Sequence, residues 1–541
     1  MATITSNRVR GGAAIVELLK AHGVDTVFGI PGVHNLDIYD ALYENPGLTN
    51  ILARHEQGAG FMADGYYRAT GKPGVALIVT GPGVTNVATA VGEAFADSSS
   101  VLVIATNLER RYIDTLEGNL HEMTDQMSVM KPIVKWSKRV MDAADIPASV
   151  GEAFAAIETG RPRPVYLEIP IDVMADELEL TGTIPNDSTT AADLTVEIAK
   201  AVDLIQNAER VMIFAGGGAT SVEASTALRV LAEELGAPVV MSLMGKGALP
   251  ADHPFAVGAF GYRWSADNPT VEVMRKSDLA IVVGSGLGVR TTGDGSMPLP
   301  STLIHIDIDP AEHGKRYQPS VSIVGDATEA LAALLDAVRS GKRPKGRWNE
   351  EQVAIIRDRL FEPSDARVAG YVPYIDALRE GMDRDAILCN DMTMMAYEGA
   401  RYFPVYEPRS YTFPRGFGTL GSALPTAIGA KVGCPERQVV AMAGDGGFQF
   451  TMEELGAAVH HRIPVTTVIF NDSTHSAVKA AQKRSYPGRY VAVDLVNPDY
   501  VKLADAYGIQ GILAGSPAEL SEALRNAKSS DMPVIIDVPI D

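Results

Sequence analysis

Two aspartates, Asp445 and Asp472, each lie just past the end of a run of apolar residues, and the first stands between glycines. The two runs, QVVAMA at 438–443 and VTTVIF at 465–470, are predicted strands, and TMEELGAAVHHR between them has the apolar spacing of a helix. In a right-handed strand–helix–strand unit both strands end at one edge of the sheet. We therefore expect the two carboxylates to be neighbours at the edge where such sheets bind ligands.

The chemistry expected of this pair is the binding of Mg²⁺ and a diphosphate. Two carboxylates that point at one spot repel each other unless a cation joins them, and Mg²⁺ commonly takes one or two carboxylates together with phosphate oxygens. Gly444, Gly446 and Gly447 would let backbone N–H groups approach an anion at a helix N-terminus. The alternative is an ordinary strand–helix turn, in which the glycines serve geometry and the aspartate caps the helix.

The elements that must position these residues recur along the whole chain. Short β-branched runs alternate with helical patterns, which predicts buried parallel sheets. Polar, turn-rich segments at 181–193 and 339–352 interrupt this pattern, and 541 residues are too many for one core. We predict an α/β protein with three doubly wound parallel-sheet domains at 1–180, 190–340 and 355–541. The expected strands lie in DTVFGIPG, NILARHEQ, VALIVTGPG, SVLVIATN, PVYLEIP, RVMIFAGGG, APVVMSLMG, LAIVVGSG, TLIHIDIDP, AILCNDM, QVVAMAGDG, VTTVIFND and PVIIDVP.

Composition narrows the class of protein. The net charge of -20, with no basic run, argues against nucleic acid as a partner. Two cysteines exclude a disulfide framework and fit a reducing compartment. The N-terminus lacks the apolar core of a signal peptide, and no apolar run reaches membrane-spanning length. We expect a cytoplasmic protein with no membrane partner.

Several motifs together carry a family resemblance. GDG followed after 24 residues by Asn-Asp resembles the cofactor motif of thiamine-diphosphate-dependent enzymes. RHEQGAGFMADGYYRATGKPG (54–74), TGPGVTN (80–86) and FGTLGSALPTAIGA (417–430) resemble the acetolactate synthase and 2-oxo acid decarboxylase branch of that family, in the same order. The resemblance spans the chain. It implies a pyrimidine-binding first domain, a central domain, a diphosphate-binding last domain, and thiamine diphosphate and Mg²⁺ as cofactors.

The resemblance also implies roles for particular residues. The metal ligands would be Asp445, Asp472 and the backbone carbonyl of Thr474. The family usually has asparagine where Asp472 stands, so this chain adds a negative charge but keeps an oxygen ligand. Thr393 falls where relatives contact the diphosphate, as do the glycines of the GDG turn.

Activation of the cofactor would fall to three further residues. By resemblance, Glu56 is the acid that protonates the pyrimidine ring, a role that burial of a carboxyl group favours. A glutamate at this position could equally be an N-terminal charge on a helix. Leu420 would be the apolar wedge that forces the two cofactor rings together, and Gly418 would offer its carbonyl to the pyrimidine. The alternative for Leu420 is an ordinary core leucine.

The implied reaction is decarboxylation of a 2-oxo acid with transfer of the resulting enamine to a carbonyl acceptor, as in an acetolactate synthase-like carboligase. One alternative is a decarboxylase that releases an aldehyde, because His121 stands near the expected enamine and could give it a proton. Another is a catalytically inactive cofactor-binding subunit, which the presence of Glu56, Asp445 and Asp472 disfavours. A nicotinamide dehydrogenase is disfavoured because GSGLGV (284–289) lacks the last glycine of its motif.

Substrate contacts, flavin and assembly are the remaining expectations. Ala477 and Ala481 leave room for a substrate longer than pyruvate. The central domain has GGG (216–218), but FGYRWSAD replaces the family's Met-His-Gly-Thr segment, so FAD is not favoured. In the family the glutamate and the diphosphate site belong to different subunits, which implies a homodimer or homotetramer. The candidate substrate residues are His34, His121, Arg290, His475, Ala477, Lys479 and Ala481.

Overall fold

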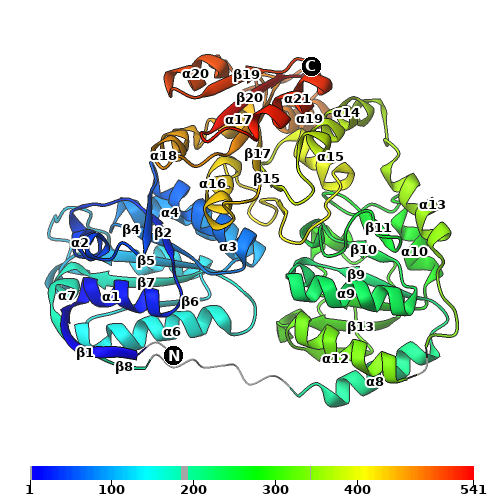
Figure 1. Cartoon of the computed structure of the whole chain (residues 1–541), viewed down its shortest axis with the longest axis horizontal. Coiled ribbons are helices and arrows are strands. Elements are labelled where there is room, and N and C mark those ends of the chain that lie inside the picture. Colours follow the sequence, from blue (N-terminus) through cyan, green and yellow to red (C-terminus); the bar gives the residue numbers. More distant parts are fainter. Residues whose placement is uncertain (1–2, 184–192, 342, 541) are drawn as a thin grey trace.

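The computed structural model describes residues 3–183, 193–341 and 343–540. These residues form three six-stranded sheets, each with helices packed around it, and Figure 1 shows the three α/β units following one another along the chain. Every pair of neighbouring strands within the three sheets is parallel. The predicted fold class is confirmed.

The first sheet has the strand order β3-β2-β4-β5-β7-β6. Its strands are β2 (Thr26–Gly29), β3 (Thr49–Leu52), β4 (Gly74–Ile78), β5 (Val101–Asn107), β6 (Trp136–Arg139) and β7 (Val165–Pro170). The helices of this part are α1 (Gly11–Ala21), α2 (Leu36–Glu44), α3 (Glu56–Thr70), α4 (Pro82–Asp97), α5 (Gln126–Met130), α6 (Ile146–Glu158) and α7 (Ile171–Ala175). A separate antiparallel pair joins β1 (Thr3–Arg10) to β8 (Glu177–Thr183).

The central sheet has the order β11-β10-β9-β12-β13-β14. Its strands are β9 (Val211–Ala215), β10 (Val239–Met241), β11 (Ala256–Ala259), β12 (Leu279–Val283), β13 (Thr302–Asp307) and β14 (Val321–Val324). Its helices are α8 (Thr195–Asn207), α9 (Val222–Leu235), α10 (Thr270–Lys276), α11 (Val289–Thr292) and α12 (Ala327–Ser340), and α13 (Glu350–Phe361) leads to the last unit.

The third sheet has the order β16-β15-β17-β18-β20-β19. Its strands are β15 (Ile387–Asn390), β16 (Tyr411–Thr412), β17 (Val439–Gly444), β18 (Thr466–Asn471), β19 (Gln510–Leu513) and β20 (Val534–Pro539). Its helices are α14 (Ala366–Gly381), α15 (Met394–Tyr402), α16 (Ala423–Gly433), α17 (Asp445–Phe448), α18 (Leu455–His460), α19 (Ser476–Ser485), α20 (Tyr500–Ala506) and α21 (Pro517–Ala527).

One helix expected from the sequence differs in detail from the structure. The single helix expected from TMEELGAAVHHR is wrong in detail, because the segment begins as a 3₁₀ turn at Met452–Glu454 and becomes α-helical only in α18. The turn lets Glu454 point into the first domain.

Most of the linker expected at 181–193 lies outside the described residues, and the exact domain limits stay predictions. Within the described ranges, no helix has the length and apolarity needed to cross a membrane.

The first and third units pack through a close crossing of α3 and α16. A Cβ atom on Gly65 would lie 2.1 Å from the carbonyl oxygen of Thr426, and one on Gly429 would lie 1.9 Å from that of Met62. Only glycine allows the two helix backbones to approach this closely. The crossing fixes the first unit against the third, so it also fixes the loops at their sheet edges.

Replacing Gly429 with alanine is expected to destabilise the protein by about 1–3 kcal/mol, because the added methyl group overlaps backbone atoms that cannot move aside. Thermal unfolding followed by circular dichroism measures this. The matched control is Gly151→Ala in α6, where an added Cβ meets no atom within 4 Å. Equal melting temperatures for the two variants would show that the crossing tolerates a side chain.

Candidate active site

The two aspartates lie at the carboxyl ends of adjacent parallel strands. Asp445 is the first residue of α17 after β17, and Asp472 directly follows β18. The Asp445 side chain is buried, and burial raises its pKa above the usual value, with the charge of Asp472 acting in the same direction. The two aspartates thus lie just past neighbouring strand ends, because Gly444 of β17 pairs with Phe470 of β18.

Asn497, which sequence reasoning missed, holds the Asp445 side chain in place. Its side-chain amide donates a hydrogen bond of 2.6 Å to Asp445 and one of 2.9 Å to the side chain of Asn471. Asp472 accepts from the backbone N–H of Thr474 at 3.0 Å and from the Ser476 hydroxyl. No motif surrounds Asn497, so only its position in the fold reveals it.

The sheet edge beside Asp445 is the switch point of the third sheet, where β15 and β17 are neighbours but the chain leaves them in opposite directions. Thr393 follows β15, and its hydroxyl oxygen lies 3.1 Å from where a Cβ on Gly444 would be. A Cβ on Gly446 would lie 2.7 Å from the His475 ring, and one on Gly447 would lie 2.7 Å from a carboxylate oxygen of Asp391. The glycines thus keep the turn open and allow close approach to its backbone.

Gly418 and Leu420 lie on a tightly held loop at the same side of the third unit. Gly418 has φ +75° and Gly421 has φ +85°, a left-handed backbone that favours glycine at both positions. The buried carboxylate of Asp391 accepts from the Gly421 N–H at 2.8 Å, and the Thr451 hydroxyl donates to the Gly421 carbonyl at 2.6 Å. Leu420 is half-buried between the two glycines.

Glu56 belongs to a second group of residues at the edge of the first sheet. It is the first residue of α3, it is half-buried, and its carboxylate accepts from the Asn86 side chain at 2.9 Å. The turn before it is held from the third unit, where the buried Glu454 carboxylate accepts from the backbone N–H groups of Arg54 at 3.0 Å and His55 at 2.9 Å. Gly58 leaves space for Glu454, because a Cβ there would lie 2.0 Å from its carboxylate.

His34 and His121 lie beside the same sheet edge. Their ring centroids are 4.8 Å apart, and burial together with the neighbouring His121 lowers the pKa of His34. Within the described residues, the Nδ1 atom of each ring is buried without a hydrogen-bond partner. A Cβ on Gly81 would lie 2.6 Å from the His121 carbonyl, which places the histidines against the loop after β4.

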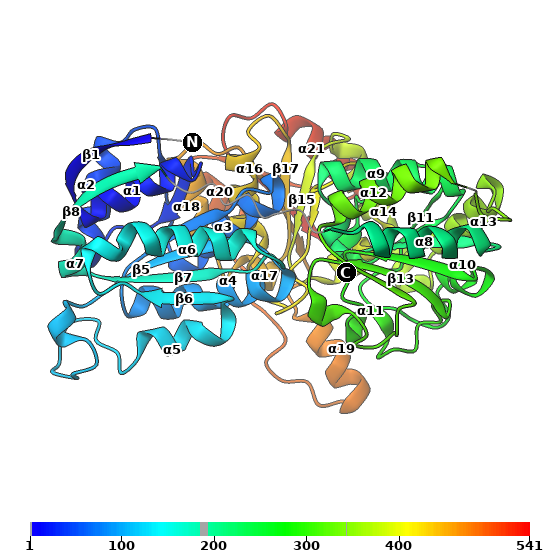
Figure 2. The same ribbon diagram turned by 90° about the horizontal axis from the view of Figure 1, so that it is seen from below.

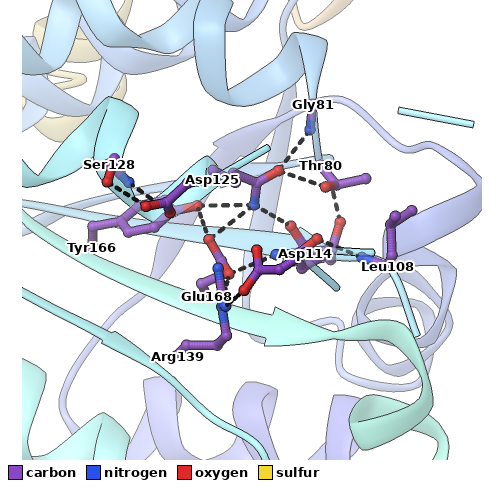
Figure 3. A network of polar contacts seen from close by, with 12 residues as sticks. Thr80, Gly81, Leu108, Asp114, Asp125, Ser128, Arg139, Tyr166 and Glu168 are labelled. Carbon is purple, nitrogen blue, oxygen red and sulfur yellow. Dashed lines mark hydrogen bonds and ion pairs between the residues drawn. The ribbon is translucent and has the colours of Figure 1, made fainter. Parts of the chain in front are cut away.

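A buried polar network holds that loop (Figure 3). The side-chain oxygen of Gln126 accepts from the Thr80 hydroxyl at 2.5 Å and from the Gly81 N–H at 2.7 Å. Its amide nitrogen donates to Glu168 at 3.1 Å, and Arg139 forms an ion pair with the same carboxylate. Sequence reasoning missed these residues. The network fixes the backbone against which His121 rests.

The remaining substrate candidates are distributed over α19 and the central unit. His475 precedes α19, Ala477 is exposed and Ala481 half-buried, and Figure 2 shows this helix projecting from the body of the chain. Lys479 forms an ion pair of 2.6 Å with Asp494. Arg290, in α11, donates to the Tyr262 hydroxyl at 2.6 Å, and the Tyr262 ring packs on Tyr397 of α15.

The candidates thus form two main groups, one around Glu56 and one around Asp445. Within the part of the chain that the structure describes, neither Glu56 nor His121 hydrogen-bonds to a residue of the second group. A separate cavity of about 610 Å³ lies between the three units and is lined by both glycine turns of the central sheet, at 217–218 and 284–288. These turns face each other at the switch point between β9 and β12.

Family models cover most of the chain in the expected order. The N-terminal TPP binding domain of the thiamine pyrophosphate enzymes matches residues 9–129, the central domain matches 198–334, and the C-terminal TPP binding domain matches 391–538. The candidate residues fall in these segments. Asp445 and Asp472 lie in the C-terminal match, and Glu56 lies in the N-terminal match.

Relatives match the chain almost from end to end. A probable 2-ketoarginine decarboxylase of Pseudomonas aeruginosa is 36% identical over 96% of this chain and 91% of its own length. A probable acetolactate synthase large subunit of Methanocaldococcus jannaschii is 35% identical over 98% of this chain and 92% of its own. The large subunit of acetolactate synthase isozyme 3 of Escherichia coli is 34% identical over 98% of this chain and 95% of its own length. The chain belongs to the thiamine pyrophosphate enzymes and is a thiamine-diphosphate-dependent enzyme of the acetolactate synthase and 2-oxo acid decarboxylase family.

Proposed function

We propose that this enzyme decarboxylates a 2-oxo acid with the help of thiamine diphosphate and Mg²⁺ and transfers the remaining fragment to a carbonyl acceptor. The observation that carries the proposal is the joint presence of Glu56 and of the Asp445–Asp472 pair, each at the carboxyl edge of its sheet and held there by hydrogen bonds. An inactive cofactor-binding subunit has no need for the glutamate.

The oxygen donors of the third unit fit a magnesium ion bound to a diphosphate. Asp445 and Asp472 supply two carboxylates, and the charge of Asp472 already disfavours ionisation of Asp445, which a cation between them would reverse. Among the described residues no group of three or more His, Cys, Asp or Glu side chains could hold a metal by itself. The remaining ligands would be the Thr474 carbonyl and phosphate oxygens, as Mg²⁺ favours.

Thiamine diphosphate, when bound, would supply a nucleophilic carbon for the 2-oxo group and a cationic ring that can hold the electron pair released with CO₂. The chain's own residues would orient the cofactor and protonate its pyrimidine ring. The Glu56 carboxyl would hold a proton at the pyrimidine ring, and the Asn86 amide keeps that carboxyl in position. Gly418 would accept from the pyrimidine amino group, and Leu420 would press the two rings together.

Two subunits would share each site. The separation of the Glu56 group from the Asp445 group within one chain supports this arrangement, because the two groups must meet across one cofactor. The assembly would then be a homodimer or a homotetramer, and a single chain would be inactive.

The residues expected to contact the substrate leave room for a 2-oxo acid longer than pyruvate. Ala477 and Ala481 are small, and α19 has no buried residue of its own in this chain. A relative is named a 2-ketoarginine decarboxylase, others acetolactate synthases, so the alternative of aldehyde release stands beside carboligation. Arg290 and His475 would face the substrate, whereas Lys479 is engaged by Asp494.

The test is a panel of 2-oxo acids of increasing length, incubated with the enzyme, Mg²⁺ and thiamine diphosphate. We expect cofactor-dependent release of CO₂ together with a hydroxyketone product. CO₂ with aldehyde alone would support the decarboxylase alternative. Absence of CO₂ from every substrate, in protein that binds the cofactor, would contradict catalysis altogether.

His121→Gln is expected to shift product yields towards ligation without blocking CO₂ loss. The imidazole can deliver a proton to the reacting carbon, whereas a glutamine amide has no proton of suitable acidity. Aldehyde and hydroxyketone are measured in one reaction and normalised to CO₂, with His253→Gln in the central unit as control. An unchanged ratio would make His121 structural, and collapse of CO₂ release would place its role before decarboxylation.

We further propose that the reaction needs no FAD. The residues at 260–267 differ from the segment that covers flavin in the family resemblance, although the cavity beside 216–218 and 284–288 is open. The absorption spectrum of the purified enzyme tests this directly. A flavin spectrum that is lost together with activity on flavin removal would contradict it.

A further inference from the structure

A buried glutamate of the first domain reaches into the loop that carries Gly418 and Leu420. Glu93 lies on α4 and only 1% of it is exposed. One carboxylate oxygen accepts from the backbone N–H groups of Gly416 at 3.1 Å and Phe417 at 3.2 Å. The other accepts from Thr419, from its N–H at 3.2 Å and its hydroxyl at 2.9 Å.

These four bonds surround the residue expected to contact the pyrimidine. Gly416, Phe417 and Thr419 flank Gly418 on both sides, so Glu93 fixes the backbone from which the Gly418 carbonyl projects. Asp391 of the third domain holds the other end of the loop through the Gly421 N–H. The loop is thus fixed between two buried carboxylates, one from each domain.

Other residues of α4 also contact the loop that carries Gly418 and Leu420, or the residues just before it. Asp97, one turn further on, accepts from the Arg415 N–H at 3.2 Å and pairs with Arg68, whose side chain is 10% exposed, at 3.1 Å. Burial raises the pKa of Asp97 to about 7, while Arg68 acts in the opposite direction. A Cβ on Gly92 would lie 2.7 Å from the Phe417 ring, so glycine there lets the ring lie against the helix.

The same helix also contacts Glu56, which in the proposed arrangement of two subunits would serve a second copy of the site. Asn86, which donates to Glu56, precedes Glu93 by seven residues, and this spacing places both side chains on one face of a helix. A carboxylate used only to join two domains could be replaced by an apolar contact, which avoids the cost of burying a charge. Here four hydrogen bonds to the carboxylate instead come from one short stretch of loop, residues 416–419.

We propose that Glu93 is a positioning residue of the cofactor site, which sets the Gly418–Leu420 loop so that the two rings of thiamine diphosphate meet in the reactive geometry. This role rests on the proposed function. Glu93 touches neither substrate nor cofactor, so its loss should slow proton removal from the cofactor and leave binding of the 2-oxo acid nearly unchanged.

The experiment compares the holoenzyme with its Glu93→Gln and Glu93→Asp variants. Glutamine keeps the size of the side chain but turns one acceptor into a donor, and aspartate keeps the charge but is one methylene too short. The readouts are thiamine diphosphate affinity by calorimetry, exchange of the cofactor's C2 proton with deuterium by NMR after acid quench, and kcat and KM. The matched control is Glu312→Gln, a buried glutamate that joins Arg161 of the first domain to the central domain.

Both Glu93 variants are expected to lose about 10–100-fold in C2 exchange and in kcat, as a displacement of about 1 Å costs in other enzymes, with KM and the control unchanged. Normal exchange and kcat in both variants would overturn the positioning role while leaving the proposed function intact. A wild-type enzyme without C2 exchange would overturn the proposed function, and this role with it.

If both variants fail to fold, Thr419→Val tests the contact from the loop side, since it removes only the hydroxyl bond to Glu93. We expect a smaller fall in the exchange rate at unchanged cofactor affinity. An exchange rate equal to that of the wild type, in a variant that folds, would contradict the role.

Discussion

Replacement of Glu56 with glutamine is expected to lower turnover by about 10²–10⁴-fold while the protein stays folded, as for loss of a general acid–base group. The pyrimidine ring needs a proton from this position, and an amide cannot supply one. Glutamine can still accept the 2.9 Å hydrogen bond from Asn86, and the Glu454 contacts to the preceding turn go to backbone atoms. The side chain should therefore keep its place and lose only its acidity.

Steady-state kinetics and C2 proton exchange of the bound cofactor measure this loss. The matched control is Glu158→Gln at the end of α6, a glutamate remote from both groups of candidate residues. A Glu56→Gln enzyme with nearly normal turnover would remove Glu56 from the mechanism and favour its alternative role as a charge at the N-terminus of α3.

The strands that position the site could be predicted because they are buried on both faces. β4 and β5 are buried at every residue, as parallel strands beneath helices must be, and their apolar runs are plain in the sequence. Two edge strands, β6 and β19, were missed for the opposite reason. β6 is WSKR, half-buried throughout, and β19 is QGIL with exposed ends, so neither has an apolar run to reveal it.

The contacts that hold the site could not be predicted from local patterns. Glu93 meets its loop partners across 323 to 326 residues of sequence, and Glu454 meets the turn before Glu56 across about 400. A lone glutamate on a helix has no motif, and both would be expected on a solvated face. Both glutamates bond across the boundary between the first and third domains. The close α3–α16 crossing brings these domains together, and only the three-dimensional structure shows it.

Asp445→Ala is expected to abolish Mg²⁺-dependent binding of thiamine diphosphate, because the diphosphate would then face Asp472 without a proper cation site. Asn497 would also lose its 2.6 Å acceptor, although it keeps its bond to Asn471. Calorimetry with and without Mg²⁺ measures the effect.

The matched control is Asp472→Asn, which keeps an oxygen ligand and removes one negative charge, so it should still bind the cofactor. Unchanged affinity in Asp445→Ala would place the metal elsewhere. Loss of binding in Asp472→Asn alone would mean that the second charge, and not the shared cation site, holds the diphosphate.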